Sequence, residues 1–101
     1  MFNINGIDWG IKLVSSNHPK ILRRNGTVAL GSCDENTHLI YINENIPEYK
    51  LKKVLCHEIT HAAMFSYNVD MTIDQEELIA DLIATYGEEI IFITNKIFKK
   101  I

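Results

Sequence analysis

The sequence predicts an α+β protein in which a small sheet is followed by two main helices. Short β-forming stretches separated by tight-turn signals fill residues 1–45. After that point, apolar residues recur with the three- and four-residue spacing of amphipathic helices. A chain of 101 residues is long enough for one domain and too short for two. We therefore expect a single domain spanning residues 1–101.

Turn signals divide the first half of the chain into candidate strands. The Asn5-Gly6 pair is a hairpin signal, and Asn25-Gly26 is a second tight turn. We expect Gly31-Ser32-Cys33-Asp34 to form a further turn. Because hairpins connect the strands, the sheet should have three or four strands, mostly antiparallel. The expected strands are residues 2–4, 7–14, 27–30 and 37–42.

The first helix should begin near Pro47 and end near Tyr67. Asn43 or Asn45 can cap its start, and proline is well tolerated in a first turn. Residues at helical spacing form the stripe that we expect to be buried: Leu51, Leu55, Ile59, Ala62 and Ala63.

A second helix should start after Asp74, which is a good N-cap with Glu77 three residues later. Leu78 and Leu82 are expected on its buried face. Gly87 predicts a kink or a break, because glycine weakens a helix interior. The apolar segment 90–101 is expected to join the core, with a homodimer as the alternative to a monomer.

Composition argues against several classes of protein. The net charge of −3 and the absence of a basic stripe argue against nucleic-acid binding. No apolar stretch approaches the roughly 20 residues that cross a membrane, and no signal peptide is recognisable. Two cysteines, Cys33 and Cys56, are too few for a disulfide framework, so we expect a reducing cytoplasm.

The first helix carries the pattern HExxH, in residues 57–61. Positions i and i+4 share one face of a helix, so His57 and His61 can aim two imidazole nitrogens at one point. Glu58 projects beside them. The arrangement suits a zinc ion and a carboxylate that takes a proton from water.

A catalytic zinc usually takes three protein ligands. Glu77 in the second helix is the preferred third donor, with Glu76 as its rival. Asp81, one turn after Glu77, can accept the second ring N–H of a ligating histidine. His18 and His38 are further candidate donors. The simpler interpretations are that His18 is a loop residue and that His38 has a structural role in its strand.

No sequence motif identifies the residue that would stabilise the tetrahedral oxyanion formed during peptide hydrolysis. Four aromatic side chains remain open for this role: His38, Tyr41, Tyr67 and Tyr86.

The paired motifs His57-Glu58-x-x-His61 and Glu77-x-x-x-Asp81 are similar to the gluzincin pattern. Over residues 28–85, the chain more closely resembles the ImmA/IrrE family of bacterial and phage metallopeptidases. The resemblance implies His57, His61 and Glu77 as zinc ligands, Glu58 as the catalytic carboxylate and Asp81 as a supporting carboxylate. It also implies that residues 37–42 form an edge strand that binds an extended peptide.

We therefore predict a zincin-like minimal domain with a zinc peptidase activity in the cytoplasm of a bacterial host. A helix-turn-helix repressor of a phage or mobile element is a candidate substrate, by analogy with the family. The alternative is a non-enzymatic module of phage origin, metal-stabilised or metal-free, that captures a partner protein.

Overall fold

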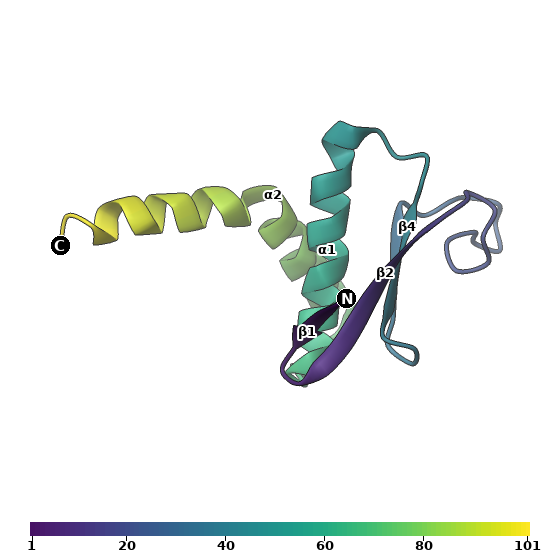
Figure 1. Ribbon diagram of the computed structural model, residues 1–101, viewed down its shortest axis with the longest axis horizontal. Coiled ribbons are helices and arrows are strands. Elements are labelled where there is room, and N and C mark those ends of the chain that lie inside the picture. Colours follow the sequence, from purple (N-terminus) through teal and green to yellow (C-terminus); the bar gives the residue numbers. More distant parts are fainter.

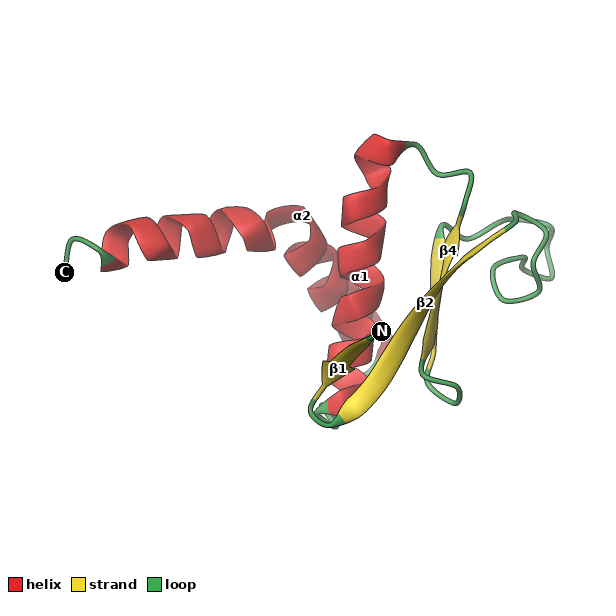
Figure 2. Cartoon of the chain, viewed as in Figure 1, coloured by secondary structure: helices red, strands yellow, loops and turns green.

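A computed structural model describes all residues from Met1 to Ile101, and its elements confirm the α+β prediction (Figures 1 and 2). Four strands come first and two helices follow. The elements are β1 (Phe2–Ile4), β2 (Ile7–Val14), β3 (Gly31–Asp34), β4 (Leu39–Asn43), α1 (Glu48–Ser66) and α2 (Ile73–Phe98).

The sheet is mixed, with the strand order β1-β2-β4-β3. The pairs β1–β2 and β3–β4 are antiparallel, as the hairpin signals predict. The central pair is parallel, with Ile11 opposite Ile40. A parallel pair needs a long connection, and residues 15–38 provide it by passing through β3 before the chain returns as β4.

Two expectations about the strands were wrong. Gly31–Asp34, expected as a turn, is β3 and pairs with β4. The stretch 27–30 contributes only an isolated bridge between Leu22 and Val28. The reason is local. Arg23 N–H donates to Thr27 O across the Asn25-Gly26 turn at 2.9 Å, so residues 23–27 form a closed turn of their own. Strand β3 therefore begins only at Gly31.

The main core lies where the sheet meets α1. Trp9 of β2, Ile40 and Ile42 of β4, and Ala62 of α1 are completely buried and pack together. The indole N–H of Trp9 donates to Ser66 Oγ at 2.9 Å, so the buried ring keeps a polar partner at the end of α1.

The helix caps differ from the expected ones. Helix α1 follows Pro47 with no side-chain cap, because the Asn43 side chain accepts from Asn45 N–H and Ser16 Oγ–H instead. Helix α2 starts earlier than expected: Thr72 is the N-cap and forms a capping box with Gln75, so Asp74 lies inside the first turn.

Helix α2 packs on α1 through small residues rather than through its leucines. Ala80 is fully buried, whereas Leu78 and Leu82 are 70% and 49% exposed, which contradicts the expected buried face. The less exposed positions of α2 lie at helical spacing: Glu76, Ile79, Ala80, Ala84 and Gly87.

The C-terminal part of α2 does not join the core, so that expectation was wrong as well. The helix is continuous through Gly87 and does not break there. In Figure 1 its first part lies beside α1, and its last part bends away and projects from the domain. Every residue from Glu88 to Ile101 is exposed. Neither helix combines the length and the apolar character that a membrane span requires.

Removing the acceptor of the Trp9 hydrogen bond should destabilise the fold. Ser66→Ala leaves a buried indole N–H unpaired, and we expect the free energy of unfolding to fall by about 1–3 kcal/mol in urea titrations. The exposed hydroxyl of Ser15 is the matched control, because its loss in Ser15→Ala should change stability by less than about 0.5 kcal/mol. Equal effects of the two substitutions would contradict this account.

Candidate metal centre

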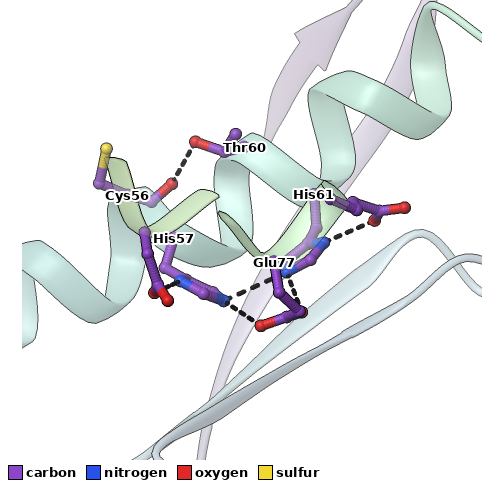
Figure 3. Close-up of polar contacts among 7 residues, drawn as sticks. Cys56, His57, Thr60, His61 and Glu77 are labelled. Carbon is purple, nitrogen blue, oxygen red and sulfur yellow. Dashed lines mark hydrogen bonds and ion pairs between the residues drawn. The ribbon is translucent and has the colours of Figure 1, made fainter. Parts of the chain in front are cut away.

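Three side chains from two helices converge on one point (Figure 3). His57 and His61 lie one turn apart on α1, with their Nε2 atoms 3.1 Å from each other. Glu77 of α2 faces both rings. Its Oε1 lies 2.8 Å from Nε2 of His61, and its Oε2 lies 3.3 Å from Nε2 of His57. The structure thus brings together the three side chains that the sequence nominated as ligands.

The other nitrogen of each ring faces a second carboxylate. Nδ1 of His57 lies 3.0 Å from Asp81 Oδ1, and Nδ1 of His61 lies 2.6 Å from Glu76 Oε1. An ionised carboxylate only accepts hydrogen bonds, so Glu76 and Asp81 favour the tautomer of each ring that carries its proton on Nδ1. In that tautomer the lone pair on each Nε2 is available to a cation, and the contacts at Nδ1 hold both rings in orientation.

Glu76 occupies a different place from the one expected. The sequence offered Glu76 as the rival of Glu77 for the third ligand position, and a buried face made of Leu78 and Leu82 would turn it toward solvent. Those leucines are exposed, and the face of α2 carrying Glu76 turns toward α1. Its side chain is 25% exposed, against 51% for Glu77, and it supports His61 as Asp81 supports His57. The spacing of Glu76 from Ala80 and Ala84 is the signal that identifies this face.

The donor set fits zinc. Two Zn–N bonds of about 2.0–2.1 Å at a tetrahedral angle separate their nitrogens by roughly 3.4 Å, close to the separation found between the two imidazoles. The three candidate ligand atoms lie within 4.8 Å of one another. Two imidazoles and one carboxylate also leave a coordination position for a further ligand.

Glu58 lies beside this cluster on the side that faces the sheet. It is only 7% exposed, and burial raises the pKa of its carboxyl, while the neighbouring His57 and His61 act in the opposite direction. Strand β3 passes very close: a Cβ added to Gly31 would lie 3.0 Å from Glu58 Cγ. Only glycine lets the strand approach the carboxylate this closely, a requirement that the sequence did not reveal.

A hollow of about 360 Å³ opens next to the cluster. Its walls come from α1, α2, β3 and the loop before β3, and they include Arg23, Cys33 and the candidate ligands. Burial, together with the charge of Glu58, raises the pKa of the Cys33 thiol to about 12. Cys33 is therefore a neutral thiol at neutral pH, and its sulfur is not among the atoms that converge with the two imidazoles.

The loop before β3 is held in place by an ion pair. Lys20 Nζ lies 2.8 Å from Asp34 Oδ2, and Asn36 N–H donates to Asp34 Oδ1 at 2.9 Å. The hydrogen bond from Lys20 lowers the pKa of the Asp34 carboxyl to about 2. This carboxylate stays charged at neutral pH and keeps one wall of the hollow fixed.

The remaining histidines and tyrosines that the sequence nominated lie away from the cluster. His38 packs against Trp9, with ring centroids 5.1 Å apart, and His18 stacks on Tyr41 at 5.3 Å. Tyr67 and Tyr86 are mostly exposed. None of the four candidates for oxyanion stabilisation lines the hollow. Arg23, which the sequence reasoning overlooked, is a cationic side chain that does.

No protein-family model matches the chain, and neither a curated protein nor a solved structure matches it. The likeness of the motifs to ImmA/IrrE metallopeptidases therefore stays a prediction from the sequence.

Substitutions of the three carboxylates that face the histidines should differ in how much they weaken zinc binding. Removing a ligand, in Glu77→Ala, should cost the most. Removing the charge that orients a ring, in Glu76→Gln or Asp81→Asn, should weaken binding about 10–100-fold. Competition with a chromophoric chelator measures each affinity.

Asp74→Asn is the matched control for these substitutions. Asp74 lies in the first turn of α2 together with Glu76, and it contacts neither histidine. It should leave zinc affinity unchanged. If Glu76→Gln and Asp81→Asn behaved like Asp74→Asn, the two carboxylates would have no role in orienting the rings.

Proposed function

We propose that this protein is a zinc-dependent peptidase with His57, His61 and Glu77 as its metal ligands. One observation carries the proposal: two Nε2 atoms and one carboxylate meet at a single point, while a further carboxylate faces the other nitrogen of each ring. A cluster of ion pairs that only joined the two helices would not need two adjacent imidazoles whose Nε2 atoms face each other. A cation placed between them relieves the repulsion between the lone pairs.

A zinc ion held there would supply Lewis acidity, which acidifies water and polarises a carbonyl group. The proton transfers belong to Glu58. Its carboxylate takes a proton from the attacking water and returns it to the leaving amine. Burial supports this role, because a carboxyl with a raised pKa is a better proton acceptor near neutral pH.

An extended substrate has a natural binding edge in this sheet, although the edge is not the one expected. Residues 37–42 were predicted as the edge strand, but β4 lies between β2 and β3 and is paired on both sides. The strand next to the cluster with a free edge is β3. We infer that a peptide adds to β3 and places its scissile bond beside Glu58.

The cellular setting follows from chemistry and from the motif resemblance. Both cysteines are free, which suits a reducing cytoplasm, and we assign the activity to the cytoplasm of a bacterial host. The resemblance to ImmA/IrrE peptidases suggests a helix-turn-helix repressor of a mobile element as the substrate.

Glu58→Gln tests the peptidase directly, because it removes the proton acceptor and keeps the shape of the side chain. We expect turnover to fall about 10²–10⁴-fold while zinc content stays that of the unaltered protein. Zinc-loaded protein is incubated with a library of proteome-derived peptides, and mass spectrometry identifies the cleaved bonds.

The Glu58→Gln protein, purified in the same way, is also the control for contaminating peptidases. Equal cleavage by both proteins would assign the activity to a contaminant. Stoichiometric zinc binding without cleavage of any peptide would contradict the peptidase and favour the alternative, a metal-stabilised module that captures a partner.

A further inference from the structure

The last part of α2 is an amphipathic helix with no partner in the chain. We call residues 88–101 the distal segment; α2 ends within it at Phe98, and a final turn of three residues follows. All of its side chains are exposed, and Figure 1 shows that it projects away from the rest of the domain. Its one ion pair to the body joins Glu88, the first residue of the segment, to Lys52 of α1 at 2.8 Å.

Six of the seven apolar residues of the distal segment gather on one side of the helix, and Phe92, which is 67% exposed, lies on the opposite side. At about 100° per residue, the six span an arc of roughly 160° centred near Ile90. These side chains are between 46% and 97% exposed. The members of this apolar face are Ile90, Ile91, Ile93, Ile97, Phe98 and Ile101.

Three isoleucines separated by one three-residue step and one four-residue step lie along one half of this face. Ile90, Ile93 and Ile97 have the spacing of a coiled-coil seam. Leaving such a face in water is costly, because burying an isoleucine side chain is favourable relative to leaving it exposed. A partner helix with a matching seam would cover it.

Charges along one edge of the apolar face specify the partner. Glu89 lies near the start of the segment, and Lys96 and Lys100 lie near its end. By helical geometry, all three fall within about 40° of one another, next to Ile93. In an antiparallel pair of identical helices, this edge of one copy faces the same edge of the other. Glu89 of each copy then meets Lys96 or Lys100 of its partner.

A parallel pair would instead place this edge against the opposite edge of the partner helix, which carries Thr94 and no charged side chain, so Glu89, Lys96 and Lys100 would lack charged partners. We therefore propose that the distal segment binds a second copy of this chain as an antiparallel two-helix coiled coil. The two-fold axis passes near Ile93 and Thr94, midway between the acidic and basic ends. This association is independent of the proposed zinc chemistry.

The paired segment is about 20 Å long, and an interface of this size belongs to the small class. We therefore expect a dissociation constant in the micromolar range. Sedimentation velocity of the full chain, from about 1 to 500 µM, should show a reversible monomer–dimer equilibrium.

Charge exchange gives the sharpest test. Glu89→Lys makes the edge entirely basic, and the double substitution Lys96→Glu/Lys100→Glu makes it entirely acidic. Each protein alone should dimerise at least about 10-fold more weakly than the unaltered chain. An equimolar mixture of the two should recover dimerisation, because basic and acidic edges then meet in the antiparallel arrangement.

Lys99→Glu is the matched control, because by helical geometry Lys99 lies on the side opposite the apolar face. It should leave the equilibrium unchanged. Recovery in the mixture also shows that both altered proteins remain folded.

An unaltered chain that stays monomeric at 500 µM would overturn the proposal, as would a mixture that dimerises no better than its components. Binding of that monomer to vesicles of phosphatidylcholine and phosphatidylglycerol would assign the apolar face to a membrane surface instead.

Discussion

The close contact between α1 and α2 is the constraint on which the candidate metal centre depends. The face of α2 that meets α1 carries the small residues Ala80, Ala84 and Gly87 beside Ile79, and these small residues allow the two helices to approach closely. This approach brings the carboxylates of α2 within hydrogen-bonding reach of the imidazoles of α1. Leucines in the same positions would have separated the two halves of the site.

Within the site, the carboxylates divide two tasks between them. Glu76 and Asp81 each face Nδ1 of one histidine, at 2.6 and 3.0 Å, and Glu77 faces the two Nε2 atoms. Three carboxylates and two nitrogen lone pairs in so small a volume repel one another. A divalent cation offsets this repulsion, which couples metal binding to the stability of the contact between the helices.

Helix α2 carries two separate surfaces. Its first half contributes to the metal centre and is packed on α1, whereas its distal segment lies beyond the domain and presents an apolar face. The ion pair between Lys52 and Glu88 marks the transition between them. Pairing of two distal segments would join two domains without covering either hollow beside Glu58, because the two surfaces are far apart along the helix.

The sequence by itself determined the features that depend on neighbours in the chain: the Asn5-Gly6 hairpin, the helix carrying HExxH, and the shared face of His57 and His61. Helical and strand periods fix these directions locally. Tertiary structure decided the parallel pairing of β2 with β4, the edge position of β3 and the inward turn of Glu76. Those outcomes depend on which faces of distant elements pack together, and small residues such as Ala80 set that choice without leaving a strong local signal.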